Sequence, residues 1–84
     1  MEIVNRLGLH ARAAAKLVHT AGAFQSKVTV IREGEEVDGK SILGILLMAA
    51  GQGSRITLRC EGEDEEEALR AVTALIANRF DEES

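Results

Sequence analysis

The chain has 84 residues, of which 45% are hydrophobic and 29% charged, a composition ordinary for a soluble globular domain. We therefore expect one domain over residues 1–84, and the hydrophobic content excludes an intrinsically disordered chain. No apolar run approaches the roughly 20 residues that a transmembrane helix needs, so no membrane insertion is expected. Residues 1–4 lack the features of a signal peptide, and the single cysteine, Cys60, suits a reducing compartment, which together predict a cytoplasmic protein.

The net charge of −4 is unevenly distributed along the chain. Residues 1–60 carry eight Lys and Arg against five Asp and Glu, whereas residues 61–84 carry two against nine. The first part therefore suits an acidic partner or a phosphate group. The only aromatic residues are Phe24 and Phe80, which are too few for the stacking platforms of nucleic-acid binding, so no nucleic-acid partner is expected. Two histidines and one cysteine are also too few for a closed zinc site, and we expect no metal or cofactor.

The hydrophobic pattern predicts seven elements in the order β-α-β-β-α-β-α. Strands are expected over residues 2–7, 25–32, 36–38 and 54–61, and helices over about 10–21, 42–50 and 64–80. The apolar face of the first helix is expected at Ala11, Ala14, Ala15, Val18 and Ala21, and that of the last at Leu69, Val72, Leu75, Ile76 and Phe80. With antiparallel pairing through a hairpin at residues 33–35, this order predicts an α+β sandwich with helices on one face of one sheet. Asp64 and Glu67 have the spacing of a capping box at the start of the last helix.

Residues 34–41 satisfy the pattern G-x-x-x-x-G-K-[ST] of a phosphate-binding P-loop. Glu35, Glu36 and Asp38 would place three carboxylates where loop amides should surround phosphates. The chain is also too short for the parallel sheet that carries this loop. The segment is better interpreted as a hairpin followed by a helix cap.

The segment Gly8-Leu9-His10-Ala11-Arg12 places a histidine where a strand gives way to a helix. The unpaired backbone N–H groups of Ala11, Arg12 and Ala13 would favour an anion beside that histidine. Arg12 adds a planar cation suited to phosphate oxygens, and Lys16 lies one turn further along. Residues of these types can accept a phosphoryl group on a ring nitrogen. On these local residues alone, a solvated histidine without chemistry is the favoured interpretation.

His19 and Ser41 are two further candidate residues. His19 lies on the opposite side of the helix from His10, near its C-terminus, so a structural role is expected for it. Ser41 has the position of an N-cap, and the segment 42–50 that follows is apolar on all sides. Because a small one-sheet domain leaves one helix face outside, some of these apolar side chains should be exposed as a docking patch.

Three segments in register resemble one family. Residues 8–16 resemble the active-site signature of HPr, the histidine-containing phosphocarrier of the bacterial phosphoenolpyruvate:sugar phosphotransferase system. Residues 39–44 resemble the regulatory serine segment of that family, and residues 53–69 resemble its last strand and the start of its last helix. The resemblance covers nearly the whole chain. It implies an open-faced β-sandwich with a four-stranded antiparallel sheet and three helices on one face.

The resemblance also implies roles for individual residues. His10 matches the histidine phosphorylated on Nδ1 by phosphorylated enzyme I, and Arg12 the arginine that steadies the phosphoryl group. Ser41 matches the serine that HPr kinase/phosphorylase modifies in some bacteria. Ile42, Leu43 and Leu46 match apolar positions that dock partner proteins, and the basic surface that includes Lys16 fits an acidic partner. The family usually has proline where this chain has Ala13, which keeps the helix but loses the fixed φ of proline.

The resulting hypothesis is a monomeric phosphocarrier that accepts from enzyme I at His10 and donates to a downstream protein of the system. It would be a covalent intermediate of phosphoryl transfer rather than a stand-alone turnover enzyme. A paralogue that acts mainly as a regulator in a nitrogen-type branch is the alternative. A ligand-binding α+β module is a third, and it predicts an unreactive His10.

Overall fold

The computed structural model of the protein describes residues 1–83. Its elements in chain order are α1 (Ala11–Gly22), β1 (Lys27–Arg32), β2 (Glu35–Asp38), α2 (Ile42–Met48), β3 (Thr57–Glu61), α3 (Glu65–Ala77) and a 3-10 turn, η1 (Arg79–Asp81). The predicted α+β fold class is confirmed: three α-helices accompany an antiparallel sheet.

The three named strands form a sheet in the order β2-β1-β3. β1 and β2 are joined by the predicted hairpin, with Arg32 opposite Glu35, and β1 pairs with β3 with Val30 opposite Leu58. Gly34 occupies the turn with a φ of 83°, a left-handed conformation that glycine adopts without strain. Residues 34–41 are therefore a hairpin and a helix cap, as interpreted from the sequence, and not a P-loop.

The regular strand expected over residues 2–7 is not confirmed. Residue Glu2 makes only an isolated antiparallel bridge to Arg55, and the Ile3 N–H and carbonyl pair with Ser54 and Gly53 at 2.8 Å each. Beyond Ile3 the chain turns, because the Gly8 N–H donates to the Asn5 carbonyl at 3.2 Å. A fourth strand is thus reduced to one bridge and its neighbouring hydrogen bonds.

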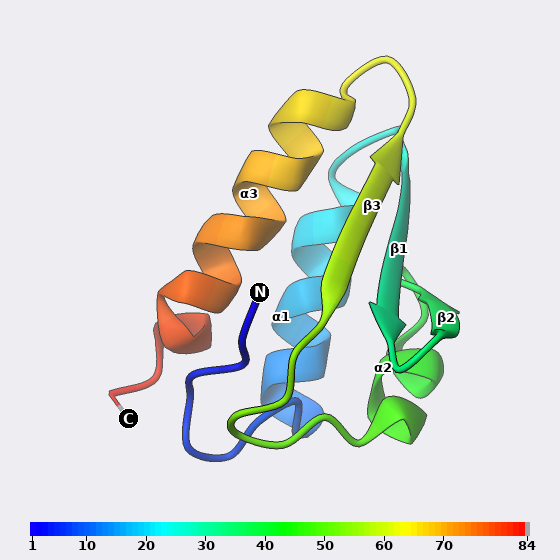
Figure 1. The fold of residues 1–84 in the computed structure, drawn as a ribbon. Coiled ribbons are helices and arrows are strands. Elements are labelled where there is room, and N and C mark those ends of the chain that lie inside the picture. Colours follow the sequence, from blue (N-terminus) through cyan, green and yellow to red (C-terminus); the bar gives the residue numbers. More distant parts are fainter. Residues whose placement is uncertain (84) are drawn as a thin grey trace.

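Helices α1 and α3 lie side by side over one face of the sheet, and α2 lies beside β2 (Figure 1). The core between these layers is formed by fully buried aliphatic side chains from the N-terminal segment, α1, β1, the residue before β3 and α3, including Ile3, Leu17, Val30, Ile56 and Val72. Within residues 1–83, no helix combines the length and apolar character that crossing a membrane requires.

The apolar face predicted for α1 is partly wrong. Ala14 and Ala21 are buried as expected, but Ala11 and Ala15 are exposed, and Ala13 and Leu17 are fully buried instead. An alanine-rich segment offers several alternative alanine stripes, and the large side chain of Leu17 selects the one that is buried.

The last helix also differs from its prediction at both ends. Asp64 stands at the N-cap but makes no capping hydrogen bond with its side chain. Its carboxylate instead accepts hydrogen bonds from the Gln25 and Ser26 N–H groups, at 2.9 Å each, and from the Ser26 hydroxyl, so it ties the segment between α1 and β1 to the start of α3. The helix ends at Ala77, and Phe80 reaches the core from the turn that follows.

Candidate functional site

The site is built on a tight turn that delivers the chain into α1. Gly8 has a φ of 64°, and the Leu9 N–H donates to the Ala50 carbonyl at 2.9 Å. A Cβ atom at Gly8 would lie 2.6 Å from the Ala50 oxygen and 2.7 Å from the Gly51 Cα. Only glycine therefore fits here, because both the backbone conformation and the space exclude a side chain.

The structure places His10 at the N-cap of α1, at the strand-to-helix junction noted in the sequence. Its Nδ1 accepts a hydrogen bond from the Arg12 N–H at 3.3 Å, while its carbonyl accepts from Ala14 N–H at 2.8 Å. The side chain of His10 remains 27% exposed, so the ring is accessible to a partner. A ring nitrogen is thus directed at the free amides of the helix N-terminus, where an anion is favoured.

The second ring nitrogen of His10 is held by a residue that sequence reasoning missed. Glu82 Oε2 lies within hydrogen-bond reach of His10 Nε2, and Glu82 Oε1 accepts from Asn5 Nδ2 at 2.9 Å. The Asn5 amide and, to a smaller extent, the His10 ring hold the pKa of the Glu82 carboxyl below its usual value, against the effect of partial burial. No local pattern marks Glu82, because it lies 72 residues from His10 in the chain.

Arg12 and Lys16 lie on one side of α1, where with His19 and Asp81 they line a shallow groove. The backbone of Arg12 faces the His10 ring, and its side chain is exposed. Lys16 Nζ is directed at the C-terminal turn, where it donates to the Phe80 carbonyl at 2.8 Å and lies 3.6 Å from Asp81 Oδ2. The structure therefore brings the backbone of Ala11–Ala13 and the His10 ring together, and it engages Lys16 with the C-terminal turn.

Ser41 is the N-cap of α2, as predicted, and its Oγ accepts the Gly44 N–H at 3.1 Å. Ile45 and Met48 of this helix are buried, whereas its other large apolar side chains are exposed: Ile42, Leu43, Leu46 and Leu47. We refer to these four residues as the α2 patch. Helix α2 lies at the end of the molecule where α1 begins (Figure 1), so the α2 patch and His10 share that end.

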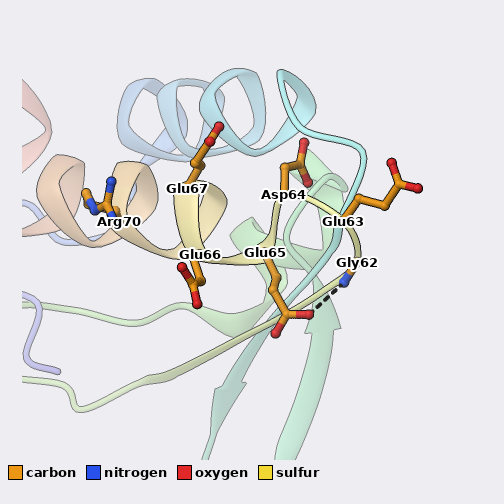
Figure 2. Close-up of a pocket in the computed structure, with 7 residues that line it drawn as sticks. All are labelled: Gly62, Glu63, Asp64, Glu65, Glu66, Glu67 and Arg70. Carbon is orange, nitrogen blue, oxygen red and sulfur yellow. Dashed lines mark hydrogen bonds between the residues drawn. The ribbon is translucent and has the colours of Figure 1, made fainter.

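A concave surface at the start of α3 is negatively charged, in contrast to the basic side chains of α1. Figure 2 shows its lining, five consecutive acidic residues from Glu63 to Glu67 together with Gly62 and Arg70. The Glu65 carboxylate reaches back to the Gly62 N–H at 3.4 Å. The acidic side chains other than Asp64 are exposed, as expected for a solvated helix start, and their charge disfavours a phosphate there.

Cys60 lies on the half-buried face of β3 and packs against the core. Burial, together with the negative charges of Glu65 and Asp64, raises the pKa of its thiol. A thiol of this kind is a poor nucleophile near neutral pH, which fits a side chain that serves in packing. Among residues 1–83, no cluster of three His, Cys, Asp or Glu side chains is placed to hold a metal ion.

An α+β sandwich with an accessible histidine at the N-cap of its first helix has the architecture of a histidine phosphocarrier. Residues 1–78 match the family described as the PTS HPr component phosphorylation site. The chain is 58% identical over 80 residues to phosphocarrier protein HPr of Cupriavidus necator, covering 95% of this chain and 90% of that one.

Solved structures of HPr proteins have the same fold. The crystal structure of HPr-C-His from Thermoanaerobacter tengcongensis has a TM-score of 0.96 and 45% sequence identity, covering 100% of this chain and 94% of that one. The crystal structure of an HPr dimer from the same organism has a TM-score of 0.83 at 45% identity, covering 98% and 94%. The chain belongs to the HPr family of phosphocarriers of the phosphotransferase system.

Proposed function

We propose that this phosphocarrier accepts a phosphoryl group from phosphorylated enzyme I on Nδ1 of His10 and passes it to a downstream protein of the phosphotransferase system. The observation that carries the proposal is the N-cap position of His10, with Nδ1 turned toward the Arg12 N–H. A phosphoryl group bound to that nitrogen would lie beside the amides of Ala11, Arg12 and Ala13. The guanidinium of Arg12, two residues away on an exposed position, is suited to bind its oxygens.

We assign the docking of protein partners to the α2 patch, together with Lys16 on α1. Four large apolar side chains exposed on one short helix form the kind of surface that a protein partner covers. Ile42, Leu43 and Leu46 would contact enzyme I, and the acceptor would use the same surface in turn. Because each partner must leave for the next to bind, the carrier would work as a monomer in the cytoplasm.

We assign a regulatory role to Ser41. Phosphorylation by an HPr kinase/phosphorylase would add about two negative charges beside the α2 patch. The Ser41 hydroxyl lies next to the Gly44 N–H, so a phosphate there would be near the helix start while disturbing the apolar surface around it. We expect this modification to weaken the docking of enzyme I.

The test is a phosphorylation assay with purified chain, phosphoenolpyruvate and enzyme I from the same source, followed by intact mass spectrometry. We expect a gain of one phosphate that is acid-labile and absent from His10→Ala. His19→Ala is the matched control on the same helix and should still gain the phosphate. A folded wild-type chain that gains no phosphate, or a His10→Ala chain that does, would contradict the assignment.

A further inference from the structure

The Glu82 side chain bridges two partners that lie far from it in the chain. One carboxylate oxygen, Oε1, accepts from Asn5 Nδ2 at 2.9 Å, and the other, Oε2, meets Nε2 of His10. The Glu82 side chain is only 14% exposed, although it lies near the chain end. Both oxygens are thus committed to separate partners, which is an unusually defined position for a residue so near a terminus.

The orientation of the Asn5 amide is fixed by a second contact. Asn5 is fully buried, and its Nδ2 also donates to the Gly8 carbonyl at 2.8 Å. Turning the amide over would place Oδ1 against both the Gly8 and Glu82 oxygens, which cannot donate. Asn5 therefore acts only as a donor toward residue 82, which must offer it an acceptor.

The contacts of the two Glu82 carboxylate oxygens together determine the tautomer of the His10 ring. Since Oε1 is engaged by Asn5, Oε2 is the atom that faces Nε2, and an ionised carboxylate only accepts hydrogen bonds. The neutral ring must then carry its proton on Nε2, which leaves the lone pair on Nδ1, where the Arg12 N–H already points. We propose that Glu82, oriented by Asn5, is a positioning residue that sets the tautomer and ring orientation of His10 so that Nδ1 is the nucleophile.

This inference rests on the proposed function of His10 as the phosphoryl acceptor. In the transfer, the Nδ1 lone pair forms the new N–P bond while the bond from phosphorus to the donor breaks and its electron pair stays with the donor. The proton on Nε2 does not move, so the ring becomes positively charged with the Glu82 carboxylate beside it. Among the charged groups nearby, Lys16 acts on the Glu82 carboxyl and lies 3.6 Å from Asp81 Oδ2, and Arg12 follows His10 by two residues. The two cations partly offset the negative charge of the phosphoryl group.

The substitution Glu82→Gln gives the sharpest test, because it nearly preserves the shape of the side chain but leaves only one acceptor oxygen on it. Asn5 requires that oxygen, so the Gln NH₂ group would face Nε2 and favour the proton on Nδ1, where it blocks the nucleophile. Alanine would leave the ring free to adopt either tautomer. We therefore expect Glu82→Gln to be slower than Glu82→Ala, an order that a merely structural role of Glu82 does not produce.

The experiment measures phosphorylation by phosphoramidate, a small donor whose nitrogen leaves as ammonia, so that docking of a protein partner plays no part. We expect a rate about tenfold below wild type for Glu82→Gln and about threefold below for Glu82→Ala. Loss of the correct tautomer in a buried catalytic triad has a larger effect, but the His10 ring is more exposed than a triad histidine, so solvent compensates in part. Glu83→Gln, which changes the neighbouring exposed carboxylate, should react like wild type. ¹⁵N NMR of the unmodified chain should show Nε2 protonated in wild type and a shift toward Nδ1 protonation in Glu82→Gln.

Equal rates for wild type, Glu82→Gln and Glu82→Ala, or a wild-type ring protonated on Nδ1, would overturn this inference alone. A wild-type chain that accepts no phosphoryl group from either phosphoramidate or enzyme I would overturn the proposed function, and this inference with it. The urea midpoint of each variant is measured in parallel, so that a slow variant is compared at equal folded fraction.

Discussion

The Lys16 ammonium on α1 donates a hydrogen bond to the main-chain carbonyl of Phe80, with 2.8 Å between Nζ and the oxygen. That carbonyl lies in a turn where Arg79, Phe80 and Asp81 have φ values of 56°, 53° and 64°. Left-handed conformations of non-glycine residues cost of the order of 1–3 kcal/mol each, so the turn needs outside support. The buried Phe80 ring and Lys16 supply this support, and the turn places Glu82 next to His10.

Replacing Lys16 by methionine should therefore loosen the C-terminal turn. The variant loses a hydrogen bond from a charged donor and the 3.6 Å pair with Asp81, so we expect about 1 kcal/mol less free energy of unfolding. Amide hydrogen exchange at Asp81 and Glu82 should accelerate more than exchange elsewhere. Arg70→Met, on the exposed side of α3, is the control for loss of one charge. Unchanged exchange at residues 81 and 82 would show that Phe80 alone holds the turn.

Gly8→Ala should be strongly destabilising. The new Cβ would meet two backbone atoms closer than 3 Å, and backbone cannot move aside as a flexible side chain can. With the left-handed φ added, we expect a loss of about 2 kcal/mol or more, measured as a shift of the urea midpoint. Gly51→Ala is the matched control: Gly51 lies across from Gly8, and a Cβ there meets nothing within 4 Å. Similar midpoints for both variants would contradict this account of the turn.

Asp64 should make the stability of the protein sensitive to acid. The Ser26 hydroxyl, followed by the Gln25 N–H, holds the pKa of the Asp64 carboxyl below its usual value. A carboxyl with a lowered folded pKa contributes stability that is present above its unfolded pKa, about 3.9, and is lost as the pH falls through the folded value. Urea midpoints measured from pH 6 down to pH 2.5 should therefore fall less steeply in Asp64→Asn than in wild type. Glu63→Gln, one residue earlier and exposed, should retain the wild-type slope; a wild-type slope in Asp64→Asn would contradict the prediction.

The features that could be predicted from the sequence are those that depend on neighbours in the chain. The N-cap position of Ser41 and the hairpin at Gly34 follow from local chemistry, and both are confirmed. The sequence also placed His10 at the start of the first helix, and the structure makes it the N-cap. The exposed apolar side chains of α2 followed from the size of the fold, since a helix apolar on every side cannot bury all of them in so small a domain.

The features that escaped prediction depend on distant contacts. Asp64 has a good local capping pattern, but Gln25 and Ser26, which lie 38–39 positions away in the chain, offer three donors, and the carboxylate binds them instead. The role of Asn5 in turning the chain shortened the expected first strand, and its contact with Glu82 spans 77 positions. A linear pattern contains no signal for such pairs.

Ser41 allows the effects of capping and of charge to be separated. Ser41→Ala removes the side-chain acceptor of the Gly44 N–H and should cost about 1 kcal/mol of stability. Ser41→Asp keeps a good N-cap residue, so its stability should remain close to that of wild type, but it places a carboxylate next to the α2 patch. We expect Ser41→Asp to lower the rate of phosphoryl transfer from enzyme I while Ser41→Ala, at equal folded fraction, does not.

The donor used in that assay identifies the cause of the Ser41→Asp effect. With phosphoramidate, which needs no docking surface, Ser41→Asp and wild type should react at the same rate, because the new charge lies at α2 and not at the His10 ring. With enzyme I, the rate for Ser41→Asp should approach that of wild type as the concentration of the chain is raised, since a weakened complex is restored by mass action. A Ser41→Asp chain that accepts from enzyme I as fast as wild type at low concentration would contradict the regulatory role assigned to Ser41.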